Sequence, residues 1–320
     1  FEPWTTYVTV LDVSDRRAPE VVQTTSMEGR YIDSRGVGDY VYLLVSNDGG
    51  APLPEVIDDD DDPDTPGRYE TKEEYLARVT ANPGQFVEDA LPNYSSYGPD
   101  GELVRTGLLN LPEDIYEPIV PGAANLVSVV SLDVESDEPG LADSAAVYST
   151  GASTIYASLD NFYVFDGDYV EEDGQATRIV KFDWDPETGG VEFAAQTVVP
   201  GYILNQFSAD ERDGVLRIAT TVRNQNSGNW TGRSENMLFV LAEDDGVLET
   251  VGSLQNLALD ETMRSVRFLG DRAFVTTYRN VDPLFALDVS DPANPRSVGH
   301  ITLPGFTTYM HLVDENYLLT

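Results

Sequence analysis

Two landmarks recur along this sequence, and they constrain its fold more than any other feature. The first is a strand of β-branched and aromatic residues that ends in an Asp-containing turn, found at 8–15, 127–137, 178–186, 237–244 and 284–292. The second is a strand found at 38–45, 153–165, 213–221, 270–278 and 314–319. Most copies begin with Gly-Asp or Asp-Gly, and the others hold the corresponding position in their repeat. Outside one long insertion, successive copies lie about 45 to 60 residues apart, which indicates about five repeats.

The clearest repeat, residues 263–303, shows how many strands one copy holds. Its pattern predicts strands at Ser265–Phe268, Ala273–Tyr278 and Leu284–Val289, with a fourth beginning at Arg296. A four-stranded sheet cannot bury both of its faces alone, so neighbouring copies must stack around an axis. The sequence therefore predicts an all-β fold, a β-propeller of four-stranded blades spanning residues 1–320. Because the last copy is incomplete, the ring is not expected to close within these residues, and the chain is expected to be a segment of a longer one.

Residues 47–122 interrupt this pattern and are predicted to be an acidic insertion within the propeller. Asp58–Asp64 concentrates negative charge and is expected to be a solvated loop. The spacing of charged and apolar residues in Thr71–Val79 predicts a short surface helix. The rest of the insertion, rich in Pro, Gly and Asn, is expected to be loop.

The charge balance excludes several classes of partner. The chain has 56 acidic and 19 basic residues, a formal net charge of -37, and only two lysines, Lys72 and Lys181. Such a surface repels nucleic acid and anionic lipid. Molar salt shortens the Debye length to about 3 Å and screens the self-repulsion, so a high-salt habitat is predicted. There is no cysteine, signal peptide or membrane-spanning stretch, so disulfides are excluded and no direct membrane insertion is expected.

Several segments together resemble a known family. They are 31–35, 37–42, 199–208, 265–273, 281–285 and 304–306, together with His311 and 314–316. Jointly they are similar to the secreted β-propeller domain family of bacteria and archaea, which is distantly WD40-like. The resemblance covers nearly the whole chain except the insertion. It implies a propeller on an extracellular or cell-surface protein, and it implies no catalytic residue.

The two histidines offer little catalytic chemistry. His300 and His311 cannot form a multi-His metal site, and both are expected to be structural. No Gly-x-Ser-x-Gly motif supports a serine nucleophile. An enzyme is therefore the less favoured class, although a secreted propeller hydrolase or dehydrogenase with an active site in its channel remains an alternative.

Acidic clusters suggest calcium as the single candidate cofactor. Asp58–Asp64 is one cluster, and Asp166, Asp168, Glu171 and Asp173 form another, whose turn glycines could wrap an ion. Neither cluster has EF-hand spacing, so a solvated acidic loop is the favoured interpretation of both. A calcium-stabilised subunit of an extracellular filament or surface assembly stays open as a further alternative.

Two sequons and one loop point to the cell surface. Asn93 and Asn229 are N-glycosylation acceptors in stretches expected to be loops. In the loop around Asn229, the candidate interaction residues are Trp230, Arg223 and Arg233, because aromatic and Arg side chains dominate binding hot spots. Elsewhere, Arg267 and Arg279 are expected to pair with Asp residues of neighbouring turns and so fasten one blade to the next.

Taken together, these features predict a non-catalytic binding or assembly module at the cell surface in high salt. It would present loops from a rigid propeller to a protein or glycan partner. A homo-oligomer or a larger assembly that exchanges strands at an open sheet edge is also expected.

Overall fold

The computed structural model divides the chain into two compact units. Unit 1 comprises Phe1–Ser149 with Pro186–Val191, and unit 2 comprises Thr150–Asp185 with Glu192–Thr320. The structure describes residues 4–47, 53–57, 67–117, 119, 125–136, 138–149, 152–170, 174–226, 229–278, 282–303, 309–314 and 317–319. Asp58–Asp64, Glu171, Asp173 and Arg279 lie outside these residues.

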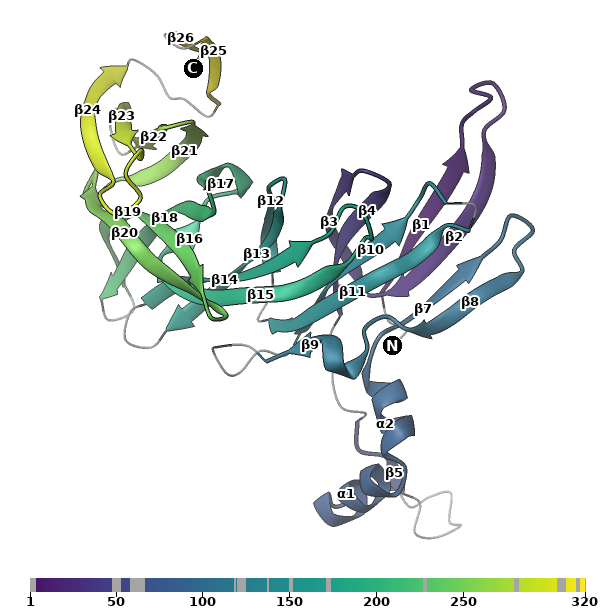
Figure 1. Ribbon diagram of the computed structural model, residues 1–320. Coiled ribbons are helices and arrows are strands. Elements are labelled where there is room, and N and C mark those ends of the chain that lie inside the picture. Colours follow the sequence, from purple (N-terminus) through teal and green to yellow (C-terminus); the bar gives the residue numbers. More distant parts are fainter. Residues whose placement is uncertain are drawn as a thin grey trace. The chain divides into compact units, whose positions relative to one another are not determined.

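Unit 1 contains two antiparallel sheets (Figure 1). The first has the order β1-β2-β7-β8, formed by β1 (Thr5–Asp12), β2 (Glu20–Glu28), β7 (Asn93–Tyr97) and β8 (Leu103–Leu108). The second has the order β3-β4-β10-β11-β9, formed by β3 (Arg30–Val37), β4 (Tyr40–Asn47), β10 (Asn125–Asp133), β11 (Gly140–Ser149) and the short parallel strand β9 (Ile115–Tyr116). A core of apolar residues from both sheets, including Met27, Leu43 and Val130, joins them.

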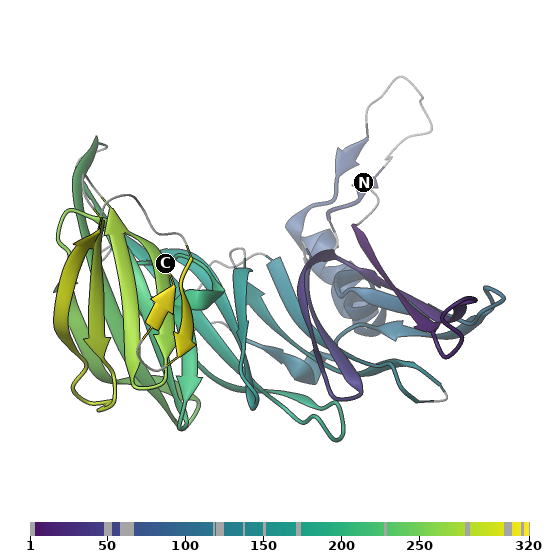
Figure 2. The ribbon, with the colours of Figure 1, turned by 90° about the horizontal axis from the view of Figure 1, so that it is seen from above.

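The insertion is more ordered than the sequence predicts. The expected helix is confirmed as α1 (Lys72–Ala81), which begins with a capping box: Glu74 N–H donates to Thr71 Oγ1 at 3.3 Å, and Thr71 N–H donates to Glu74 Oε2 at 2.7 Å. The stretch expected to be loop also contains α2 (Pro83–Ala90), the hairpin of β5 (Val56–Ile57) and β6 (Arg68–Tyr69), the short helix η1 (Pro112–Asp114), and strands β7, β8 and β9. Figures 1 and 2 show α1 and α2 outside the sheets of unit 1.

Unit 2 begins with a nine-stranded sheet that consists of two groups of strands joined at one edge. They are formed by β12 (Ala152–Ala157), β13 (Asn161–Val170), β14 (Gly174–Trp184), β15 (Val191–Pro200), β16 (Tyr202–Ile203), β17 (Ala209–Arg212), β18 (Val215–Asn226), β19 (Asn229–Asp244) and β20 (Val247–Leu257), with the short helix η2 (Gln206–Ser208). Strands β12 to β15 follow chain order, as do β17 to β20. The two groups meet through a single parallel pair, Gln196 with Val247.

The last complete repeat matches its predicted strands. The sheet β21-β22-β23-β24 consists of β21 (Thr262–Leu269), β22 (Arg272–Tyr278), β23 (Asp282–Asp288) and β24 (Arg296–Leu303), in chain order. The hairpin of β25 (His311–Asp314) and β26 (Tyr317–Leu319) follows it. The prediction of repeated four-stranded sheets is thus confirmed.

Neighbouring sheets of unit 2 bury their faces against each other (Figure 2). One apolar cluster joins β13 to β15 with β17 to β20, through residues such as Phe165, Ile179 and Leu216. A second cluster joins β18 to β20 with β21 to β23, through residues such as Val240 and Val275. The middle sheet therefore packs on both faces, as the stacking argument requires. Within the described residues, no helix has both the length and the apolar character that crossing a bilayer would need.

In three repeats a polar side chain holds the crossover from one sheet to the next. Thr6 Oγ1 donates to the carbonyl of Gly29 at 2.8 Å, and Thr177 Oγ1 donates to the carbonyl of Gly201 at 2.7 Å. Gly201 follows Pro200 with φ 89°, a conformation that favours glycine, so the Val-Pro-Gly turn at 199–201 has an architectural role. In the next repeat Asn236 Nδ2 takes the same role and donates to the carbonyl of Leu257 at 2.9 Å.

Candidate functional site

The candidate calcium cluster contains a buried ion pair. Asp166 lies on β13 opposite Arg178 on β14, and Arg178 Nη2 donates to Asp166 Oδ2 at 2.5 Å. Both side chains are 1% exposed. Asp168 continues β13, and its side chain lies outside the described part. The described residues contain no group of three or more acidic or His side chains that could hold a metal ion. Calcium binding by this segment stays a prediction.

Both sequons lie in strands, so the expectation that they lie in loops was wrong. Asn93 begins β7, where its Nδ2 donates to the carbonyl of Leu91 at 3.3 Å, and Ser95 Oγ lies 3.0 Å from Thr106 Oγ1 across the pair β7-β8. Asn229 begins β19 and pairs with Asn226. The pairing of β18 with β19 continues past their apolar residues into a polar stretch, because the backbone hydrogen bonds between strands form with polar residues as well.

The candidate interaction residues lie at the end of this long hairpin. Trp230 pairs in register with Gln225, so it belongs to a strand rather than to a loop. Arg223 is exposed, and its guanidinium lies 5.1 Å from the ring centre of Tyr202. The side chains of Trp230 and Arg233 lie outside the described part of the chain.

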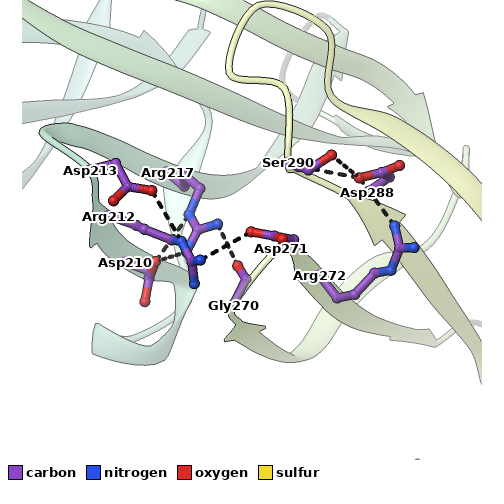
Figure 3. Close-up of polar contacts among 9 residues, drawn as sticks. All are labelled: Asp210, Arg212, Asp213, Arg217, Gly270, Asp271, Arg272, Asp288 and Ser290. Carbon is purple, nitrogen blue, oxygen red and sulfur yellow. Dashed lines mark hydrogen bonds and ion pairs between the residues drawn. The ribbon is translucent and has the colours of Figure 1, made fainter. Parts of the chain in front are cut away.

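Arginines join neighbouring repeats in unit 2, but the pairing with Asp expected of Arg267 is not found among the described residues. Arg217 on β18 is 3% exposed; its Nε donates to Asp210 Oδ2 at 3.0 Å, and its Nη1 donates to the carbonyl of Gly270 in the next sheet at 2.7 Å (Figure 3). Arg212 also reaches that turn, with its Nη2 3.2 Å from Asp271 Oδ1. Arg267, expected to pair with an Asp, instead lies between two aromatic rings: its Cζ is 3.5 Å from the Phe207 centroid and 5.3 Å from that of Tyr309.

The turn that closes β23 is held by hydrogen bonds to two carboxylates: Asp291 Oδ1 accepts from the N–H of Ala293 at 3.1 Å, and Asp288 holds Ser290. Asp288 Oδ1 accepts from the Ser290 hydroxyl at 2.7 Å and from the Ser290 N–H at 3.2 Å. Its carboxylate also pairs with Arg272 at 3.1 Å (Figure 3) and with Arg296 at 2.9 Å. These donors hold the pKa of Asp288 well below its ordinary value of 3.8.

A polar cluster joins the two earlier repeats of unit 2. Asn161 Nδ2 donates to Glu211 Oε1 at 2.5 Å, and the N–H of Glu211 donates to the Tyr156 hydroxyl at 2.9 Å. Burial raises the pKa of both Tyr156 and Tyr163, so both phenols stay neutral at physiological pH. The described contacts of this cluster therefore fit a structural role.

The two histidines differ in their described contacts, and a structural role for both stays a prediction. The ring of His300 on β24 packs on Phe285 of β23, with centroids 5.2 Å apart. His311 begins β25 and is exposed.

An open groove lies beside β1 in unit 1. It has a volume of about 630 Å³ and is lined by Trp4–Thr9, Gly29–Tyr31, Ser34, Val41 and Leu43. The rings of Trp4, Tyr7 and Tyr31 are 73%, 68% and 47% exposed. Within the described residues β1 ends its sheet, with β2 as its strand neighbour. The groove thus combines exposed aromatic side chains with an open strand edge. Sequence reasoning missed it, because the alternation in Thr5–Asp12 predicts a strand but not what covers its second edge.

Comparisons with known proteins agree with this architecture. A family model described as "Beta propeller domain" matches residues 2–320. An uncharacterised protein of Archaeoglobus fulgidus is 45% identical over 145 residues, which are 45% of this chain and 21% of that protein. An uncharacterised protein of Methanocaldococcus jannaschii is 38% identical over 123 residues, which are 38% of this chain and 18% of that protein. The chain matches about a fifth of the length of these relatives.

Solved structures give weaker matches. A chimera of ACO and RPE65 aligns with a TM-score of 0.34 and 9% identity, covering 92% of this chain and 77% of the chimera. Saccharomyces cerevisiae Sqt1 aligns with a TM-score of 0.31 and 10% identity, covering 91% of this chain and 80% of Sqt1. A 6-phosphogluconolactonase-like protein of Bacteroides uniformis, named in its title as a putative one, aligns with a TM-score of 0.25 and 12% identity, covering 71% of this chain and 83% of that protein. All three TM-scores lie below 0.5, so these structures say nothing about what this chain does.

Proposed function

The chain belongs to the β-propeller domain family, and on that premise we propose that it is a non-catalytic binding and assembly module of the extracellular or cell-surface space, working in high salt. The net charge of -37 supports the high-salt setting, and the two sequons support the extracellular one. The polar contacts between repeats support a rigid scaffold, since they fix the turn at Gly270 to the preceding sheet.

The observation that carries this proposal is the open edge of β1 with its aromatic groove. An exposed strand edge offers unpaired backbone groups to another extended segment, and pockets beside the edge select side chains. We infer that the open edge of β1 takes up an antiparallel strand from outside the described residues. Trp4 and Tyr7 then pack on the apolar side chains of that strand.

The repeats indicate which kind of strand fits. The sequence of β1 carries the same Asp-turn landmark as β10 and β23. In their complete sheets, β10 pairs with β4 and β23 pairs with β22, both strands that follow a turn with Gly and Asp. The open edge of β1 is therefore suited to a strand resembling β4 or β22.

The insertion supplies a second contact element. Two bidentate arginine pairs brace it: Arg68 binds Glu74 at 2.7 and 2.8 Å, and Arg78 binds Glu70 at 3.2 and 2.6 Å. On this braced hairpin and helix, Val56 and Tyr69 are 61% and 71% exposed. Rigid presentation of such side chains lowers the entropy lost on binding.

A labelled peptide with the sequence of residues 38–47, the β4 strand with its turn, tests strand addition. We expect the peptide to bind the chain in molar KCl, by fluorescence anisotropy, and to bind the Tyr7→Lys variant more weakly, because a charge on the edge opposes pairing. Tyr317→Lys on β26, equally exposed but remote in sequence from β1, is the matched control. A scrambled peptide that binds as well, or wild-type affinity in Tyr7→Lys, would rule out this role for β1.

A further inference from the structure

Three arginines of unit 2 stack on aromatic rings and pair with no carboxylate among the described residues. The guanidinium of Arg223 lies 5.1 Å from the ring centre of Tyr202, and that of Arg264 lies 5.5 Å from the ring centre of Tyr278. Arg267 lies between Phe207 and Tyr309. In a chain with 56 acidic and 19 basic residues, carboxylates are not scarce, so these cations without a carboxylate partner are unexpected.

Two other stacked arginines show the usual arrangement. Arg78 lies 5.2 Å from the ring centre of Tyr75 and also pairs with Glu70, and Arg217 lies 5.3 Å from the ring centre of Phe268 and also pairs with Asp210. Stacking in this protein therefore does not prevent an arginine from pairing with a carboxylate. The guanidinium groups of Arg223 and Arg264 keep that capacity available for a ligand. Arg267 donates from Nε to the carbonyl of Met310 and from Nη1 to that of Val266, both at 3.1 Å, and keeps Nη2 available.

The stacks occupy elements that touch one another. Arg264 and Arg267 lie three positions apart on β21, which contacts η2, the helix that carries Phe207. Arg267 Nε also donates to the carbonyl of Met310 at 3.1 Å, which ties Tyr309 to the same place. We call Phe207, Arg264, Arg267, Tyr278 and Tyr309 the arginine–aromatic surface. Arg223 on β18 borders it, since β18 contacts both β21 and η2.

The rings of this surface remain accessible. Phe207, Tyr278 and Tyr309 are 46%, 44% and 56% exposed. Partial burial lowers the pKa of Arg267, so its guanidinium has lost hydration without gaining a carboxylate partner in the described chain. A carboxylate placed there would compensate that loss, because a charge-assisted pair is stronger where water is partly excluded.

We propose that the arginine–aromatic surface binds a carboxylate-rich segment of an acidic partner protein. The planar guanidinium fork matches a carboxylate with two parallel hydrogen bonds, and stacking on a ring fixes the fork in advance. Arg and aromatic residues are also the side chains that dominate protein–protein hot spots. In molar salt, with a Debye length of about 3 Å, the repulsion between two acidic proteins is screened while contact pairs persist.

Labelled poly-L-glutamate is the probe for this surface, with binding to the full chain measured by fluorescence anisotropy in 2 M KCl. We expect wild type to bind, and the double variant Arg264→Gln/Arg267→Gln to bind about tenfold more weakly, as loss of hot-spot residues does. The matched control is Arg16→Gln/Arg17→Gln, which removes two exposed arginines of the β1-β2 turn and is expected to leave the affinity unchanged.

The single variant Arg264→Gln separates a loss of binding from a loss of folding, because the described contact of its side chain is the Tyr278 ring alone. It is expected to weaken binding several-fold at an unchanged melting temperature. Absence of binding by wild type, equal losses in both double variants, or wild-type affinity in Arg264→Gln overturns the proposal. Binding of polygalacturonate but not of poly-L-glutamate also overturns it, in favour of an acidic glycan. Because β1 carries none of these residues, its strand-addition test can fail or succeed separately.

Discussion

Buried charge in this protein is restricted to a few residues with defined partners. Among the described residues, the charged side chains with nearly complete burial are Glu70, which pairs with Arg78, and Asp166, Arg178 and Arg217. Asp166 and Arg178 pair within one sheet, and Arg217 joins one repeat to the next. An isolated buried charge would cost far more than a paired one, so each of these residues depends on its partner.

Removing Arg217 tests the contact between repeats. Arg217→Met leaves the carbonyl of Gly270 and the carboxylate of Asp210 without their donor, and we expect a loss of about 3 kcal/mol in the free energy of unfolding. Chemical denaturation in molar salt measures this loss. The control is Arg212→Gln, whose pair with Asp271 is exposed at 44% and 61% and should contribute less than about 1 kcal/mol. Equal effects of the two variants would show that Arg217 does not fasten the sheets.

The turn held by Asp288 contributes to the stability of the folded protein, and this contribution depends on pH. A carboxyl group whose pKa is lowered by folding stabilises the protein above its ordinary pKa of 3.8, and this stabilisation is lost as the pH falls through the folded-state value. Asp288→Asn should therefore melt at a lower temperature than wild type at pH 7, and the difference should shrink from about pH 4 downward. Melting curves at pH 7 and pH 3 measure this, and a constant difference at both values would contradict the assignment.

At the scale of the element, the crossover after β20 carries unusual backbone strain. Asn256, Ala258 and Asp260 have φ of 58°, 48° and 66°, in the left-handed region that non-glycine residues rarely adopt. Asn236, fully buried, holds this segment by donating to the carbonyls of Leu257, Ala258 and Glu261.

Asn236→Ala should open this crossover. Without the amide, three carbonyls lose a donor and the strained backbone loses its restraint, so we expect a destabilisation of about 2 kcal/mol. Hydrogen exchange at the Asp260 N–H, which donates to the carbonyl of Ser234 at 2.8 Å, should become faster. The comparison variant is Thr177→Val, which removes only one hydrogen bond, to the carbonyl of Gly201, and should destabilise the protein less. An unchanged exchange rate of the Asp260 N–H in Asn236→Ala would show that Asn236 does not hold this crossover in place.

The elements that could be predicted from the sequence are those whose defining residues lie within a few positions of one another. The turn at Ser290 and the strands around it follow from residues a few positions apart, and the capping box at Thr71 does too. Strand β7 was missed because its sequence, Asn93–Tyr97, is polar and its partner β2 lies about 70 residues earlier. Asp166 was placed in a metal loop because a Gly follows it, and its partner Arg178 becomes visible only when β13 and β14 pair in register.

At the scale of the whole molecule, net charge sets the conditions for folding. With a formal charge of -37, self-repulsion destabilises the compact state at low ionic strength. The melting temperature should rise from 0.1 M to 2 M KCl as the Debye length falls from about 10 Å to below 3 Å. A melting temperature that stays constant or falls over this range would contradict the high-salt setting.

The central claim is that repeated four-stranded sheets, each built in chain order, pack side by side, with Arg217 joining the sheet of β17 to β20 to that of β21 to β24. A crystal structure of the chain grown from molar salt tests this claim most directly. It should show β12 to β15, β17 to β20 and β21 to β24 as successive sheets, with Arg217 bound to the carbonyl of Gly270. Strands of different repeats mixed in two face-to-face sheets, or Arg217 turned into solvent, would contradict it.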